Sequence, residues 1–330
     1  MTAQPPTSQP PTQEGMHRRL AQGFLAKSLA VIIQFGQQFL LVPVFLHFWG
    51  PERYSDWLVL LSTVTFLSLL DLGLQTTYSN ELLMTWSRGE RRAFNRVLHH
   101  GLAIYLILVL VAVSVLMVGA YAMPWPDLLN LKAATPVTAT MVIGVLGLYV
   151  LANIPIAMVA NIYRARGEFA LGSAVGSASL VTYLCATMVT LWLDGGMVML
   201  AAAHLVVVAA TWGAIVTHLK RRYIDLHFGL RRPSRNEIRK AMTTSPAYAV
   251  IPAAMALNVH GTVLMIAGLG AGAVEVVVFT TIRTLTGVAR QAAAQLGQAA
   301  GAEMSRHSLH RAISHRWRVS MLSWGGSAAP

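Results

Sequence analysis

The sequence has one cysteine, few acidic residues and little charge of either sign. Cys185 has no second cysteine with which to form a disulfide in the chain, and because it lies in an apolar run we expect a packed, unreactive thiol. Charged residues make up 12% of the 330 residues and the mean hydropathy is +0.55, which is unlike a soluble protein. The solvent that this composition fits is lipid.

Long apolar stretches fill most of the chain between Ala21 and Gly301. A bilayer needs about 20 apolar residues per helical span, and in lipid every backbone N–H and C=O must be paired within the protein. The stretches are too long and too continuously apolar for the alternating strands of a membrane barrel. We therefore expect an all-α, polytopic transmembrane helix bundle of about eight spans, at residues 21–48, 56–77, 101–123, 136–163, 170–193, 196–219, 241–269 and 273–300.

Lys and Arg concentrate in alternate gaps between these stretches. Short basic loops stay on the cytoplasmic side of a membrane, so this alternation predicts that both termini are cytoplasmic. The poor gaps hold only Arg53 and Lys132, whereas one rich gap, 220–240, holds eight cations. Basic loops that face anionic lipid also account for the net charge of +12, and we therefore expect membrane lipids rather than nucleic acid as partners.

The same pattern divides the chain into five parts. We expect a disordered cytoplasmic tail, a complete six-helix lobe, a basic cytoplasmic connector, the first two helices of an incomplete second lobe, and a basic cytoplasmic tail. Their predicted bounds are 1–17, 18–219, 220–240, 241–304 and 305–330.

Clustered acids, large exterior loops and metal-binding motifs are lacking. The predicted exterior connections are 49–55, 124–135, 194–195 and 270–272, which are too short to build a catalytic domain. His307, His310 and His315 do not have the spacing of a helix-face metal pair. We therefore expect neither an enzyme nor a cofactor or metal.

Ionisable residues inside the spans are the strongest functional signal, because such groups are costly at membrane depth. Arg283 lies about 12 Å from the exterior end of the last span and Arg290 lies about 10 Å further along, on the same helix face. One interpretation is that both line a wet cationic cavity and attract a phosphate or pyrophosphate. The alternatives are a structural ion pair between Arg283 and Asp71, and a side chain of Arg290 or Lys27 that reaches the headgroups.

Two runs of sequence are similar to a known family. Residues 43–81, PVFLHFWGPERYSDWLVLLSTVTFLSLLDLGLQTTYSNE, resemble the first two helices of bacterial polysaccharide biosynthesis proteins, and residues 278–291, VFTTIRTLTGVARQ, resemble the eighth helix. That family is the Wzx-type oligosaccharide flippases of the multidrug/oligosaccharidyl-lipid/polysaccharide exporter superfamily. The matching elements are Trp49-Gly50, Tyr54 with Trp57, Asp71-Leu72-Gly73-Leu74 and Arg283.

The resemblance implies a bacterial inner-membrane protein that moves an undecaprenyl-pyrophosphate-linked glycan across the bilayer for surface polysaccharide or O-antigen biosynthesis. Carried over by position, Arg283 would bind the pyrophosphate, with Lys27 and Arg290 secondary and Asp71 a structural or interlobe contact. A polysaccharide polymerase and glycosyltransferases would be partners. Family members carry twelve or fourteen spans, so we expect this chain to be C-terminally truncated relative to them.

Two other functions remain open from the residues. A drug or cation antiporter of the same superfamily needs an intramembrane carboxylate, and Asp71 is the only one well inside a predicted span. A scaffold that does not transport, or a truncated product, fits the missing helices.

Overall fold

The computed structural model describes residues 13–231, 233, 235, 239, 243, 245–270 and 272–287, and for residues 13–35, 38, 169 and 170 it describes the backbone alone. The chain forms two compact units, Met1–Phe279 and Thr280–Pro330. The residues described in them form helices, turns and loops, with no β-strand. The predicted all-α fold is confirmed.

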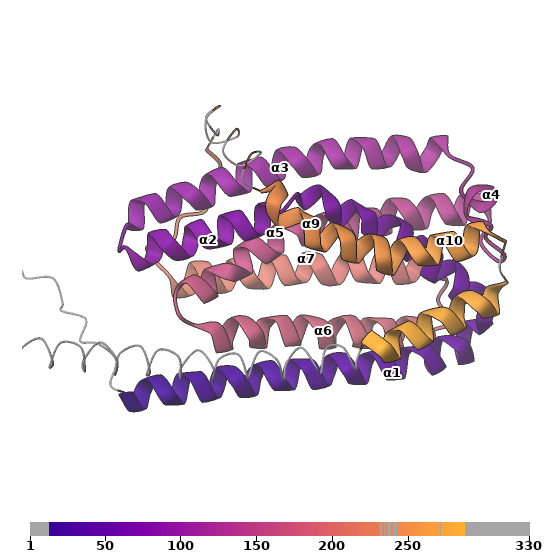
Figure 1. Cartoon of the computed structure of the whole chain (residues 1–330), viewed down its shortest axis with the longest axis horizontal. Helices are drawn as coiled ribbons and strands as arrows, with labels where there is room; N and C mark the ends of the chain where they lie inside the picture. Colours follow the sequence, from indigo (N-terminus) through magenta and orange to yellow (C-terminus); the bar gives the residue numbers. More distant parts are fainter. Residues whose placement is uncertain are drawn as a thin grey trace, which may run out of the picture. The chain divides into compact units, whose positions relative to one another are not determined.

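The elements follow one another as helices joined by short connections (Figure 1). A further helical segment, 273–287, follows the last of them. Their bounds are α1 Gln13–Thr65, η1 Phe66–Asp71, α2 Leu74–Ser87, α3 Arg91–Ala122, α4 Trp125–Leu129, α5 Pro136–Ala165, α6 Phe169–Trp192, α7 Met197–Arg222, α9 Pro246–Ala256, η2 Leu257–Gly261 and α10 Thr262–Gly268.

Several of these helices are long and apolar enough to cross a membrane. Within the described residues there are five, and the bent pair Phe39–Asp71 and Leu74–Ser87 makes a sixth. The chain is a multi-pass membrane protein. Of the eight predicted spans, the first lies within α1 and the eighth is described only as far as residue 287. The five unbent helices are Arg91–Ala122, Pro136–Ala165, Leu171–Trp192, Met197–Arg222 and Pro246–Gly268.

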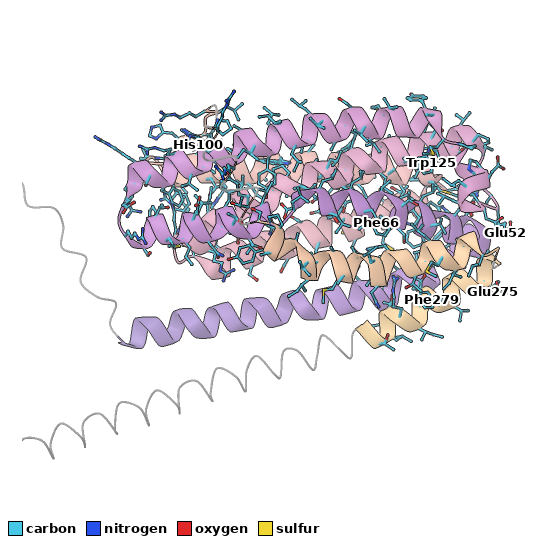
Figure 2. All side chains as sticks on the ribbon, turned by 45° about the horizontal axis from the view of Figure 1, so that its top comes forward. Glu52, Phe66, His100, Trp125, Glu275 and Phe279 are labelled. Atoms are coloured by element: carbon cyan, nitrogen blue, oxygen red, sulfur yellow. The ribbon has the colours of Figure 1, made fainter. Side chains whose placement is uncertain are left out.

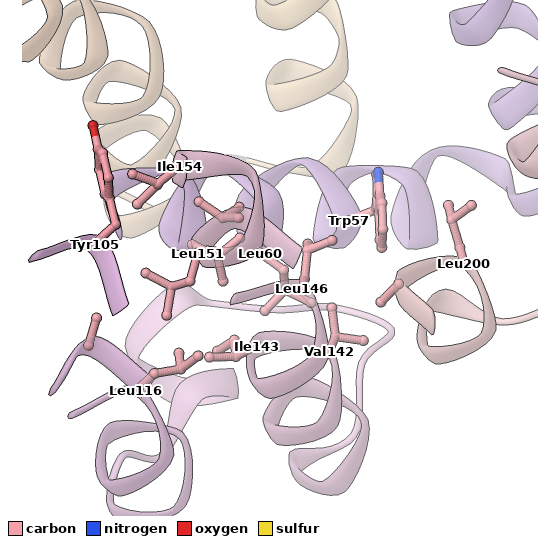
Figure 3. Packing of buried hydrophobic residues seen from close by; sticks show 14 of the residues in the cluster. Trp57, Leu60, Tyr105, Leu116, Val142, Ile143, Leu146, Leu151, Ile154 and Leu200 are labelled. Carbon is pink, nitrogen blue, oxygen red and sulfur yellow. The ribbon is translucent and has the colours of Figure 1, made fainter. Parts of the chain in front are cut away.

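Helix α5 lies at the centre of the first unit. It packs against α1, α2, α3 and α7, while α6 packs mainly on α1 and α7. The α5 side chains Leu146, Leu151 and Met158 are fully buried. Apolar groups of the neighbouring helices surround α5, whereas the other helices turn one side to lipid. Figure 3 shows Tyr105 of α3 and Trp57 of α1 on either side of the α5 residues Leu146 and Leu151.

The two ends of this unit differ in chemistry. Figure 2 shows His100 at one end, where nitrogen-bearing side chains gather, and Trp125 and Glu52 at the other. Trp49, at the second of these ends, donates its indole N–H to the carbonyl of Gly195 over 3.0 Å. The first end carries loops that are rich in Lys and Arg, and the second carries the loops around Glu52 and Trp125 that are poor in them.

Three details differ from the sequence-based expectations. The connection between the first two spans is tighter than the predicted 49–55, because α1 is two helical stretches that meet at Gly50, whose φ of 71° is available to glycine, and Pro51 starts the second stretch. The chain folds back there, since the rings of Phe45 and Tyr54 stack with their centroids 4.8 Å apart. The second span is broken rather than continuous, and the seventh contains a π-helical turn, η2. Cys185 is exposed on α6 instead of packed.

Candidate functional site

The second span breaks at Leu72 and Gly73, directly after Asp71. Leu72 has a φ of 48° and Gly73 a φ of 76°, so the 3₁₀ turn of η1 ends and α2 starts in a new direction, 44° from the first part. A left-handed leucine is strained, and such strain gathers at functional positions. Breaks of this kind in membrane helices are the usual places where transporters bind ions and substrates.

Asp71 joins the two halves of the broken helix. Its side chain is half-buried and accepts the N–H of Gln75 in the first turn of α2, at 3.2 Å to Oδ1 and 3.4 Å to Oδ2. A carboxylate that accepts a hydrogen bond from an N–H of the first helical turn satisfies a donor that has no partner within the helix. Its negative charge is also attracted to the positive end of the helix dipole. The hydroxyl of Tyr105 on α3 donates to Oδ1 over 2.7 Å.

The start of α9 packs directly on this break. A Cβ added to Gly73 would collide with the carbonyl oxygen of Ser245 and would lie 2.9 Å from the Cβ of Tyr248. Beside it, the hydroxyls of Ser245 and Thr77 are buried and lie 2.9 Å apart. The glycine in the Asp-Leu-Gly-Leu run is therefore required twice, for its positive φ and for the close approach of the seventh span.

The seventh span is also irregular where it faces α1. His260 lies in the π-helical turn η2, with Nδ1 3.4 Å from the Ser62 hydroxyl and its ring 6.4 Å from that of Phe66. Wide turns of this kind inside a helix are frequent at functional sites. His260 thus makes an interhelical contact with α1 and η1.

A second polar group inside the bundle is His204 of α7. Its Nε2 lies 3.1 Å from the hydroxyl of Thr187 on α6, and aromatic rings surround the imidazole. Nδ1 is buried and has no hydrogen-bond partner within the described part of the chain. The ring centroids of Trp57, Tyr149 and Tyr183 lie 5.9, 5.5 and 5.6 Å from that of His204.

Sequence reasoning missed His204 and Tyr105. The rule that flags ionisable residues at membrane depth applies to His204, since it lies eight residues into a predicted span, and would have found it. Tyr105 carries no such signal, because tyrosines are common in membrane helices and only the tertiary fold places its hydroxyl beside Asp71.

Cations at the His100 end hold the loops together. Arg166 has a side chain only 7% exposed, and its guanidinium lies 4.2 Å from the Trp86 ring centroid, 4.0 Å from that of Tyr223 and 2.8 Å from Asp225 Oδ2. A second pair joins Arg222 to Glu168 through two hydrogen bonds of 3.0 Å. These cations, which set the predicted orientation, are also structural.

Glu168 of that second pair has a perturbed acidity. Burial on its own would raise the pKa of Glu168, but the hydrogen bonds from Arg222 and its positive charge outweigh burial and lower the pKa. Glu168 precedes α6 and Arg222 ends α7, so this ion pair ties the loop between α5 and α6 to the end of α7.

The four site residues predicted from the sequence are Arg283, Arg290, Lys27 and Asp71. In the first unit, Asp71 is the one whose side-chain contacts the structure describes. Lys27 lies on α1, but its side chain is outside the described part, and Arg290 lies outside the described residues altogether. Arg283 belongs to the second unit, on the helical segment 273–287, where its carbonyl accepts the Thr286 hydroxyl over 2.9 Å. The cationic stripe on the eighth span stays a prediction.

The fold of this chain is similar to those of solved membrane transporters. A MATE protein in complex with MaD3S has a TM-score of 0.63 and 17% identity over 81% of this chain, and the MATE multidrug transporter DinF-BH has 0.62 and 15% over 86%. A MOP superfamily transporter from Pyrococcus furiosus, described as having a binding pocket of reverse polarity, has 0.55 and 15% over 82%. The likeness is one of fold.

The match covers only part of each of these transporters. This chain spans 61%, 64% and 63% of the lengths of the three proteins. No protein-family model and no curated protein matches the sequence. Two of these solved structures are of MATE transporters, and the third is named as a member of the MOP superfamily. None of the three is named as an oligosaccharide flippase.

Proposed function

We propose that this chain forms part of a secondary transporter that exports organic cations in exchange for protons or sodium ions. The observation that carries the proposal is Asp71, a half-buried carboxylate at a break in a membrane-spanning helix. An ionisable group at such a place is the usual means by which a transporter binds a coupling ion. The fold shared with multidrug transporters supports the same function.

The contacts of Asp71 suit a coupling role. A carboxylate has about four acceptor sites, and Tyr105 and Gln75 use only part of that capacity. Protonation or ion binding would change its hold on the first turn of α2, and thereby the angle between the two halves of the second span. His204, with an unpartnered Nδ1 in the described structure, is a second titratable group that such a cycle can use.

A second candidate is flipping of a lipid-linked, pyrophosphate-bearing oligosaccharide. The resemblance of residues 43–81 and 278–291 to Wzx-type proteins favours it, and Arg283 would then bind the pyrophosphate. Under this proposal the protein works beside a polysaccharide polymerase and glycosyltransferases in the bacterial inner membrane.

Reconstitution separates the two candidates. The full-length protein in proteoliposomes receives a pH or sodium gradient, and transport of ethidium, a fluorescent organic cation, is followed together with proton release. In separate vesicles, translocation of a pyrophosphate-linked polyprenyl oligosaccharide is measured. We expect ion-coupled movement of ethidium, with most of the exchange lost in Asp71→Asn.

The matched control is Asp194→Asn. Asp194 lies at an exposed turn with a φ of 54°, which asparagine tolerates, so this variant removes a carboxylate without touching the helix break. Ethidium exchange that is equal in Asp71→Asn and the unmodified protein would overturn the role of Asp71. Glycan translocation without ethidium exchange, and its loss in Arg283→Ala, would support the second candidate instead.

A further inference from the structure

An apolar groove opens on the surface of the first unit between α3 and α7, where Pro155 of α5 also lines it. Its volume is about 400 Å³, which is within the range of about 300–1,000 Å³ found for binding sites of small molecules. We call it the connector groove, because the segment after α7 closes one end of it. Among its lining residues are Leu102, Tyr105, Leu106, Trp212, Phe228 and Leu230.

The open side of the groove faces the hydrocarbon. Leu106 at its edge is 43% exposed, and the neighbouring α3 residues Ile107 and Leu110 are 54% and 58% exposed. An apolar surface on a spanning helix contacts lipid tails. A linear acyl chain is the ligand whose shape and polarity fit a cleft of this kind.

The closed end of the groove is built by hydrogen bonds between α3 and the connector. The amide of Asn95 donates to the carbonyl of Asp225 over 2.9 Å, and Nε2 of His99 lies 2.6 Å from the carbonyl oxygen of His227. These bonds fix the backbone that carries Phe228 and Leu230 across the end of the cleft. A chain lying in the groove would end against Phe228, with its headgroup at the connector.

Positive charge lies at this end of the groove. The Lys220 ammonium is 5.8 Å from the centre of the Phe228 ring, and Arg231 directly follows Leu230. Over residues 220–231 the sequence has four Lys or Arg, at positions 220, 221, 222 and 231, against the single acid Asp225. Cations at the membrane surface attract anionic headgroups.

We propose that the connector groove is a binding site for an anionic phospholipid of the cytoplasmic leaflet, with one acyl chain between α3 and α7 and its phosphate beside Lys220 and Arg231. The site connects to the helix break, because Tyr105 lines the groove and its hydroxyl donates to Asp71 over 2.7 Å. A bound chain would pack on the exposed Leu106, next to the buried Tyr105, and would cover the helix face that holds this hydrogen bond. The proposal does not depend on which solute the protein transports.

The molecule offers a matched control in a second apolar groove. It lies between α3 and α5, has a volume of about 530 Å³, and is lined by Met117, Tyr121, Val137 and Met141 among others. Among the described residues, neither groove is lined by a Lys or an Arg, but Lys220 and Arg231 adjoin lining residues of the connector groove. Both grooves suit an acyl chain, but of the two the connector groove is the one with cations that discriminate between headgroups.

Photoreactive lipids test the proposal. The full-length protein is placed in nanodiscs with phosphatidylglycerol or phosphatidylcholine that carries a diazirine in one chain, and the adducts are mapped to peptides by mass spectrometry. At residues 102–109 and 226–230 we expect phosphatidylglycerol to label roughly tenfold more than phosphatidylcholine, since two cations face its headgroup. At residues 136–148 the two lipids should label equally.

Variants assign the preference to its residues. Lys220→Gln with Arg231→Gln should reduce phosphatidylglycerol labelling of the connector groove to the phosphatidylcholine level, whereas Arg53→Gln, at the other end of the unit, should leave it unchanged. Leu106→Trp should fill the groove and remove labelling by both lipids, and Val115→Trp, on a lipid-facing position of the same helix, should not. Equal labelling by both lipids in the unmodified protein, or a preference that persists without Lys220 and Arg231, would overturn the proposal.

Discussion

The hydroxyl of Tyr105 donates a 2.7 Å hydrogen bond to Asp71, and so joins α3 to the break in the second span. Tyr105 is 1% exposed, which means that neither water nor lipid replaces this bond at its hydroxyl. The break itself is held from three sides, by Tyr105, by the first turn of α2 and by the start of α9. Changes at these contacts therefore test how the fold supports its candidate site.

Tyr105→Phe removes the hydroxyl and keeps the ring. A buried hydrogen bond to a charged group contributes about 1.5–3 kcal/mol. The variant should therefore lose about that much free energy of unfolding, which is measured as a lower unfolding temperature in detergent. Tyr121→Phe is the control, because Tyr121 lies on the same helix and is 82% exposed. Equal unfolding temperatures for Tyr105→Phe and the unmodified protein would show that the bond to Asp71 contributes no stability.

Gly73→Ala should destabilise the protein by at least about 1 kcal/mol, because a left-handed backbone is unfavourable for alanine. The added Cβ also meets the carbonyl of Ser245, so α9 has to move away from the break. Gly119→Ala is the control. A Cβ at Gly119, inside α3, meets nothing within 4 Å, and this variant should be neutral or stabilising by about 0.5–1 kcal/mol.

Unfolding midpoints in denaturant measure both glycine variants. If Gly73→Ala were as stable as Gly119→Ala, the left-handed turn and its close packing on the seventh span would be incorrect.

Arg166→Gln should lower the unfolding free energy by about 1–3 kcal/mol, since it removes stacking on Trp86 and Tyr223 and the ion pair with Asp225. Thermal unfolding measures the change. The control is Arg164→Gln, on an exposed position in the last turn of α5, which should shift stability by less than about 0.5 kcal/mol. An equal effect of the two variants would mean that Arg166 is an ordinary surface cation.

Acid should weaken the loop contact made by Glu168. The pKa of Glu168 is lowered in the folded protein, so its ion pair with Arg222 contributes stability above the ordinary carboxyl pKa of about 4.3 and loses it as the pH falls below that value. Glu168→Gln should therefore be less stable than the unmodified protein at pH 7, and the difference should shrink between about pH 5 and pH 3.

Unfolding temperatures across this pH range test the prediction, with Glu52→Gln, at the opposite end of the unit, as the control (Figure 2). A difference between Glu168→Gln and the unmodified protein that stays constant with pH would rule out the ion pair as its cause.

Part of the candidate site could be predicted from the residues alone. Asp71 stands out because a carboxylate inside an apolar span is costly wherever it points. The break beside it could not be predicted, since Leu72 and Gly73 read as ordinary members of an apolar helix. The residues packed around the break, Ser245 beside Gly73 and Tyr105 bonded to Asp71, come from other spans.

The sequence by itself determined that the protein lies in a membrane as helices and which loops carry positive charge. These properties follow from the polarity of consecutive residues, which each span expresses without its neighbours. Only the tertiary structure decided that α5 is the central helix, that Tyr105 meets Asp71, and that an apolar groove ends beside Lys220. Such relationships depend on which helix faces pack together, and residues far apart in the chain become neighbours only when packing selects those faces.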